Sequence, residues 1–328
     1  MKKGCIGCLG SLVILLIAGF GALLYFGLAV ARAEDRQASP ALLPSPQQYA
    51  EAALKKMDFG LYTGPDWPQQ KKQAMRDLQS AKTYQDTYLT LQKMAELSGG
   101  KHSHFYSSSE IKKEKQALTN LPDIQLSDGI LKVKLPAFMG DDRTRESYIT
   151  RLRDGLNQTG YQAVILDLQQ NSGGDIYPML AGLATLLLDD DLFQFIYKDG
   201  SKETFNLAQI IAQKGLSKIV ANPKKMAIKK RAVPIAILID GQTASSGELT
   251  ALAFKNLPNV KVFGQATAGY TSGNIPYPLY DGALLQLTTS RIQDRSGKIY
   301  ENTPIEPDQV SYHPLEDAQN WLKEMRRE

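Results

Sequence analysis

The chain has 328 residues, with 43% apolar and 22% charged side chains, which is typical of a globular protein of one large or two modest domains. Its net charge of +4 is too small to indicate a nucleic-acid-binding protein. Both cysteines, Cys5 and Cys8, lie at the start of an apolar N-terminal stretch. The rest of the chain therefore has neither a disulfide nor any cysteine chemistry.

The N-terminal stretch predicts a membrane anchor. Residues 6–31 contain no charged side chain and follow a pair of lysines. At about 1.5 Å per residue, they are long enough to cross a hydrocarbon core of about 30 Å. We expect an uncleaved single-pass anchor over residues 1–33, with the catalytic part of the chain on the extracytoplasmic side of the cell membrane. A secretory signal cleaved after Ala33 is the less favoured alternative, because the apolar core is longer than such signals have.

Beyond the anchor, proline-punctuated residues 34–48 predict a linker. Residues 49–121 have apolar side chains at partly helical spacing and predict a small helical subdomain of two or three helices. Residues 122–328 predict an α/β domain, because strands and helices alternate along them as in a largely parallel sheet with flanking helices. In chain order the patterns predict a strand at 130–135, a helix at 143–156, a strand at 161–168, a helix at 177–188, a strand at 233–239, a helix at 249–254, and strands at 260–263 and 284–289.

A small polar turn, Thr243-Ala-Ser-Ser-Gly-Glu248, separates the apolar strand at 233–239 from the following helix. It places Ser245 at a helix N-terminus, where free backbone N–H groups favour negative charge. Ser245 is therefore a candidate nucleophile beside an oxyanion hole. The competing interpretation is that Thr243 or Ser245 only caps the helix, and the turn taken alone favours capping.

A serine nucleophile needs a base, and the chain has only three histidines, His102, His104 and His313. The first two lie in a glycine-rich turn at the end of the helical region. A second glycine turn, Gly173-Gly174, follows the strand at 161–168 and can aim backbone N–H groups into a cleft. It is not part of a P-loop or a GxGxxG motif, so nucleotide binding is not expected. We also expect no cofactor and no metal.

Five motifs in order resemble the tail-specific, or C-terminal processing, serine peptidase family, and in particular its tricorn-like Ser-His-Glu branch. The resemblance covers residues 99–311 and implies a crotonase/ClpP-like fold. The motifs are Gly100-Lys-His102-Ser-x-Phe105, Asp167-Leu-Gln-x-Asn171-x-Gly173-Gly174, Thr243-Ala-Ser-Ser-Gly-Glu248, Phe263-Gly-Gln-x-Thr-Ala-Gly269 and Tyr300-Glu301-x-x-x-Ile305-x-Pro307-Asp308.

The resemblance implies a role for each matching residue. Ser245 falls on the nucleophile, His102 and not His104 on the general base, and Glu301 on the carboxylate that orients the histidine. The N–H of Ser246, with that of Gly173 or Gly174, falls on the oxyanion hole.

Two departures from the family pattern narrow the expectation. Tyr270 stands where the Ser-Lys branch has its lysine, which excludes a lysine base there. The interval between His102 and the strand at 130–135 is too short for the PDZ domain that many relatives carry. We therefore expect a membrane-anchored serine endopeptidase that cleaves exported polypeptides through an acyl-enzyme, without a PDZ domain. The alternatives are a non-catalytic binding or scaffold protein on the same fold and, ranked lower, a crotonase-type enzyme; the oligomeric state is left open.

Overall fold

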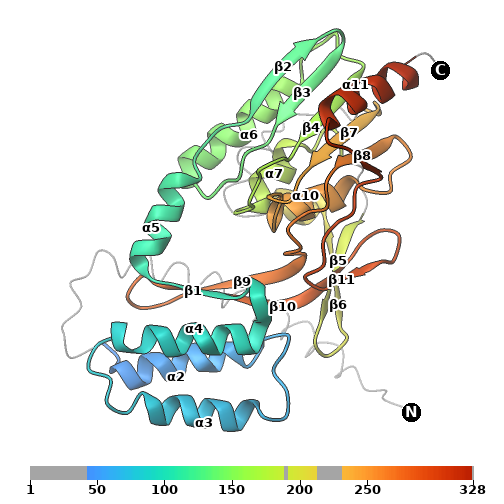
Figure 1. Ribbon diagram of the computed structural model, residues 1–328. Helices are drawn as coiled ribbons and strands as arrows, with labels where there is room; N and C mark the ends of the chain where they lie inside the picture. Colours follow the sequence, from blue (N-terminus) through green and yellow to red (C-terminus); the bar gives the residue numbers. More distant parts are fainter. Residues whose placement is uncertain (1–42, 188–190, 213–230, 327–328) are drawn as a thin grey trace, which may run out of the picture.

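The computed structural model describes residues 43–187, 191–212 and 231–326 (Figure 1). The predicted anchor at residues 1–33 and most of the predicted linker at residues 34–48 lie outside these ranges. Among the described helices, none is long and apolar enough to cross a membrane.

The N-terminal helices pack as a small layer under one sheet of the molecule (Figure 1). They are α2 (Pro46–Met57), α3 (Trp67–Asp77) and α4 (Gln85–Gly99). The first begins at a capping box, in which Ser45 Oγ accepts from Gln48 N at 3.2 Å and Gln48 Oε1 accepts from Ser45 N at 2.8 Å. Tyr49 and Met57 on its buried face are fully covered. The helical spacing of apolar residues in this region therefore corresponds to a packed helical core.

A sharp turn after α4 carries the chain from the helices to the sheets. Gly100, at the C-cap of α4, has a φ of +74°, and a Cβ on it would lie 2.5 Å from the Tyr62 ring. A side chain is therefore excluded on both conformational and steric grounds. The next elements are the short helix η2 (Gly100–His102), strand β1 (His104–Tyr106) and helix α5 (Ser108–Ala117). The turn sets His102 between the helical layer and the sheets.

The predicted parallel sheet is present and forms the core of the molecule. Its strands, in spatial order, are β12 (Gln309–Val310), β8 (Val260–Gly264), β7 (Ile235–Ile239), β4 (Ala163–Asp167), β3 (Ile130–Lys134) and β2 (Asp123–Ser127). All neighbours are parallel except β2 and β3. Every residue of β4 and β7 is buried, as expected of strands covered on both faces.

Helices cover the two faces of this sheet. They are α6 (Asp142–Leu156), α7 (Ile176–Gly182) and α10 (Ser246–Phe254) on one face and α11 (Pro314–Met325) on the other. Alternate residues of a strand point to opposite faces. Accordingly, Ile237 of β7 packs in the cluster that contains α6, α7 and α10, whereas Leu238 packs against Leu322 of α11.

A second six-stranded sheet corrects the expectation of a largely parallel fold. Its strands are β1, β10 (Leu284–Gln293), β5 (Asp191–Tyr197) and β6 (Lys202–Asn206) in order, with β9 (Ser272–Pro278) and β11 (Ile299–Tyr300) also paired with β10. All these pairings are antiparallel, and α8 (Leu207–Ala212) follows β6. The alternating pattern at 284–289 belongs to this sheet, because a strand with one half-exposed face is typical of antiparallel pairing. Strand β10 also pairs with β1 and β5, which are distant in the sequence, so local patterns did not reveal the whole sheet.

Candidate active site

Ser245 lies on a strained turn between β7 and α10. Its φ of +52° and ψ of −118° fall in a region that non-glycine residues rarely adopt, at a cost of about 1–3 kcal/mol. The turn is held by Thr243, whose Oγ1 donates to Leu168 O at 2.9 Å, just past the end of β4. Strain of this kind on a strand-to-helix turn exposes a nucleophile in other hydrolases. Thr243 therefore braces the turn, and Ser245 occupies the N-cap position of α10.

His102 lies directly opposite this serine. Its Nε2 is 3.0 Å from Ser245 Oγ, and the side chain is 7% exposed. Asn274 Nδ2 donates to His102 O at 3.2 Å, which anchors the backbone of η2 to β9. The structure thus joins two residues that are 143 positions apart in the chain, in the hydrogen-bonding geometry that a nucleophile and its base require.

The other two histidines lie elsewhere. His104, on β1, points its Nδ1 to Gln92 Nε2 at 3.2 Å and packs its ring on Tyr106. His313 is the N-cap residue of α11. Only His102 contacts Ser245 among the three, as the motif order predicted.

The other side of His102 is occupied by a serine, and this corrects the expectation for Glu301. His102 Nδ1 is 2.8 Å from Ser272 Oγ, which in turn donates to Asn302 Oδ1 at 2.9 Å. Glu301 instead pairs with Arg291. Asn302 has a φ of +51°. In this turn the side chain of Asn302, and not that of Glu301, faces Ser272. Glu301 therefore does not contact the histidine.

Sequence patterns gave no signal for Ser272. It lies within β9, outside all five motifs, and pairs with Arg291 across the hairpin with β10. For Asn302, the only hint in the sequence was its position next to Glu301. Both residues are identified by tertiary contacts alone.

The Gly173-Gly174 turn approaches Ser245 closely. Gly173 has a φ of +106°, and a Cβ on it would lie 2.8 Å from Ser245 Cβ and 3.0 Å from Ser246 N. Its own N–H donates to Asn171 Oδ1 at 2.9 Å. Ser246 Oγ donates to Gly174 O at 2.7 Å. The N–H groups of Gly174 and Ser246 have no hydrogen-bond partner among residues 43–187, 191–212 and 231–326, so both can serve a ligand oxygen.

Glu248 ties the nucleophile turn to the segment that contains Tyr270. The carboxylate is fully buried and accepts from Ser245 N, Gly269 N and Tyr270 N, each at 2.8 Å, and from the Thr267 hydroxyl. Burial raises the pKa of Glu248, and these hydrogen bonds oppose that rise. Tyr270, at the position of the family's lysine, stacks edge-on against His102 with ring centroids 5.2 Å apart.

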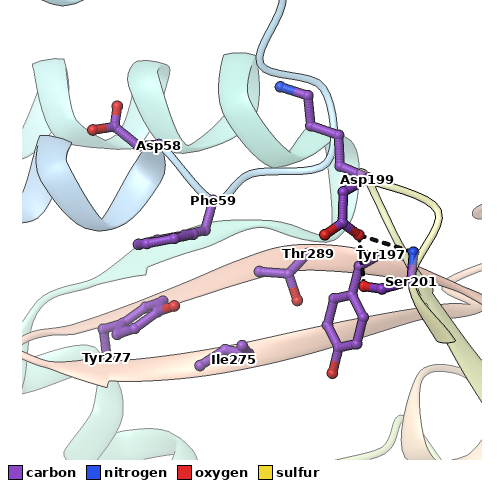
Figure 2. A pocket seen from close by; sticks show the side chains of 9 residues that line it. Asp58, Phe59, Tyr197, Asp199, Ser201, Ile275, Tyr277 and Thr289 are labelled. Atoms are coloured by element: carbon purple, nitrogen blue, oxygen red, sulfur yellow. Dashed lines mark hydrogen bonds between the residues drawn. The ribbon is translucent and has the colours of Figure 1, made fainter. Parts of the chain in front are cut away.

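A hollow of about 620 Å³ lies on the other face of strand β9, and Figure 2 shows the side chains that line it. Its lining includes Phe59 after α2, Ile275 and Tyr277 on β9, and Thr289 on β10. Ile275 and Tyr277 point away from the Ser272 face because side chains alternate along a strand. Neither Ser245 nor His102 lines this hollow, so it is separate from the serine–histidine pair.

Burial controls the protonation of His102. Desolvation, with the charge of Lys101 adding to it, lowers the pKa of His102 from 6.5 to about 4. A base must be neutral to accept a proton, so the acid limb of a pH–rate profile should have its midpoint well below pH 6.5 and close to 4. We expect the rate of labelling by a fluorophosphonate to be nearly flat from about pH 8 down to about pH 5 and to fall below that.

The same shift predicts the pH dependence of stability. Because the folded-state pKa is below the unfolded value, the contribution of His102 is complete above about pH 6.5 and is lost as pH falls toward 4. Thermal unfolding of the wild-type chain and of His102→Gln over this range measures it. If the acid limb of the labelling rate had its midpoint at or above pH 6.5, the low pKa of the buried His102 would be contradicted.

Comparison with known proteins identifies the family. Residues 129–311 match Peptidase family S41. The chain belongs to this family. It is a serine-type peptidase, and its mixed α/β fold agrees with those of solved family S41 relatives.

Individual relatives extend the likeness over most of the chain. The nisin-resistance protein of Lactococcus lactis subsp. lactis is 40% identical over 283 residues, which cover 85% of this chain and 88% of that protein. The structure of a lipoprotein from Streptococcus agalactiae aligns with a TM-score of 0.81 and 39% identity, covering 87% of this chain and 98% of the other. A photosystem II D1 C-terminal processing protease, at 15% identity and a TM-score of 0.54, covers 85% of this chain and 98% of its own and shares the fold.

Proposed function

We propose that this S41 peptidase is a membrane-anchored serine endopeptidase that cleaves exported polypeptides, with Ser245 as nucleophile and His102 as general base. The observation that carries the proposal is the 3.0 Å approach of His102 Nε2 to Ser245 Oγ. The strained backbone of Ser245 supports it, because a helix cap alone needs no such conformation. The anchor is proposed from the apolar residues 6–31.

The geometry supports an acyl-enzyme mechanism. His102 Nε2 takes the proton of the Ser245 hydroxyl as its oxygen attacks the scissile carbonyl carbon. The carbonyl oxygen becomes an oxyanion, for which we propose the N–H groups of Ser246 and Gly174 as donors. Gly173 is a weaker candidate for the second donor than Gly174, because its N–H already donates to Asn171. The protonated His102 then gives its proton to the leaving amine, and water hydrolyses the acyl-enzyme by the same steps.

We place the chain in the Ser-His part of the family and not in the Ser-Lys part. Tyr270 occupies the lysine position, and its backbone N–H is bound by Glu248. Lys101 Nζ lies 4.8 Å from the centre of the Tyr270 ring, where it adds to the low pKa of His102. The absence of a PDZ domain is proposed from the interval between η2 and β3, which holds only β1, α5 and β2 in the described chain.

For the substrate we propose nisin or a related antimicrobial peptide. The support is the relative that carries the name nisin-resistance protein and matches 85% of this chain. A peptidase anchored on the outer side of the membrane would meet such a peptide before it reaches the bilayer.

The test is to incubate the full chain with nisin and to identify the products by mass spectrometry. We expect fragments with one new terminus, and a fluorophosphonate adduct on the peptide that contains Ser245. An adduct on a different residue would overturn the assignment of the nucleophile. A chain that neither cleaves nisin or unstructured polypeptides nor forms an adduct would favour the non-catalytic binding or scaffold protein.

A further inference from the structure

The hydrogen bonds behind His102 form a chain with no charge next to the imidazole. Ser272 Oγ is 2.8 Å from His102 Nδ1 and donates its proton to Asn302 Oδ1 at 2.9 Å. Ser272 is 2% exposed, so water does not compete for these bonds.

We propose that Ser272 and Asn302 are positioning residues for His102, a role that rests on the proposed peptidase function. We call Ser272 and Asn302 together the relay.

The direction follows from the donors and acceptors that each group has. The Ser272 hydroxyl has one proton to give, and it donates that proton to Asn302 Oδ1 at 2.9 Å. An amide oxygen can only accept, so the direction of this bond is fixed by Asn302.

The last two bonds decide the tautomer of the histidine. Because Ser272 gives its proton to Asn302, its oxygen is left to accept from His102, so the imidazole carries its proton on Nδ1. The lone pair is then on Nε2, facing Ser245 Oγ. With the Asn302 amide reversed, Ser272 would donate to Nδ1 and the imidazole would carry its proton on Nε2. That tautomer cannot accept the proton of the nucleophile.

The relay differs in strength from a carboxylate in direct contact. A neutral oxygen orients the ring but adds no opposite charge to the imidazolium. Replacing a directly bonded carboxylate by its amide costs about 10⁴-fold in rate in a Ser-His-Asp enzyme. Here Glu301 pairs with Arg291 and does not contact His102. We therefore expect Glu301→Gln to stay within about threefold of the wild-type rate.

The test uses the full chain with nitrogen-15 in its histidine rings. The three histidines give separable signals, assigned with His104→Gln and His313→Gln, and the ring nitrogens report the tautomer and the pKa of His102. The labelling rate with a fluorophosphonate is measured on the same samples. Ser311→Ala is the matched control, because Ser311 is another buried serine, 6% exposed, whose Oγ accepts only from His313 N.

Removing the first link should change both readouts. In the wild-type chain we expect the Nδ1–H tautomer alone. Ser272→Ala should populate the Nε2–H tautomer and slow labelling about tenfold, the factor that corresponds to one neutral hydrogen bond. Ser272→Thr, which keeps the hydroxyl, should restore both. Ser272→Asp should keep the Nδ1–H tautomer and raise the pKa of His102 by about 1–3 units, which moves the acid limb of labelling to higher pH.

Removing the second link tests the direction. Asn302→Ala leaves Ser272 in place but removes the acceptor of its proton, so we expect a mixture of tautomers. Asn302→Asp, whose carboxylate can only accept from Ser272, should keep the Nδ1–H tautomer. A pure Nδ1–H tautomer in Asn302→Ala would overturn the role of Asn302, and wild-type tautomer and rate in Ser272→Ala would overturn the relay. A different result would overturn the proposed function and leave the relay standing: the tautomer responds as expected, but the wild-type chain forms no adduct on Ser245.

Discussion

Ser245→Ala should abolish covalent labelling and reduce kcat/KM for peptide cleavage about 10⁶-fold, the loss seen when a serine nucleophile is removed from a comparable enzyme. The alanine keeps the Cβ at the strained position, so the backbone cost of the turn is unchanged and only the oxygen is lost. Glu248 would still accept from the backbone N–H of residue 245. The expected result is therefore an inactive chain with a nearly unchanged thermal midpoint.

The measurement is the initial cleavage rate together with the stoichiometry of the fluorophosphonate adduct. Ser311→Ala, a buried serine outside the site, serves as control and should keep the wild-type rate and full labelling. Labelling that survives Ser245→Ala would show that another residue is the nucleophile. A large fall in the thermal midpoint of Ser245→Ala would instead mean that its loss of activity reports unfolding.

His102→Ala should reduce kcat/KM by at least about 10³-fold, because removal of the base leaves only the oxyanion donors and substrate binding. Ser245 and His102 act as one unit, so the double substitution should cost little more than either single one. Non-additivity is the sharper measurement, since two independent structural defects at separate positions would add. It requires the two single variants and the double variant to be compared at one pH.

His104→Ala provides the matched control for this histidine. It lies two positions away, also carries an aromatic contact, and bonds to Gln92 and not to Ser245. We expect its rate to stay within about fivefold of the wild type, because only a partly buried neutral hydrogen bond is lost. A larger loss in His104→Ala than in His102→Ala would contradict the assignment of the base.

The site shows where sequence patterns succeed. Ser245, His102 and the Gly173-Gly174 turn were predicted from motifs, and the structure brings all of them together. Each belongs to a short local pattern whose backbone has a special requirement, such as a positive φ or a helix N-terminus. Requirements of this kind are visible in a few consecutive residues.

Glu301 shows where they stop. Its motif was present, yet the side chain pairs with Arg291 while Asn302 reaches Ser272. Which of two adjacent side chains faces a site depends on one backbone dihedral and on the strand behind it. Ser272 was missed for the same reason, because a serine in a β-strand has no local signature until the strand is placed beside η2.

By itself the sequence determined the class of structure and the candidate chemistry: a buried strand, a polar turn with a serine, three histidines, and an apolar stretch at residues 6–31. All of these can be identified from the residue types and from short stretches of neighbouring residues. The tertiary structure alone decided that a second, antiparallel sheet exists and that β9 brings Ser272 to His102. The pairing of β10 with β1 and β5 depends on which surfaces are buried together, and no short window of sequence contains these distant partners. The distance of 3.0 Å between Ser245 and His102 is the outcome of that long-range packing.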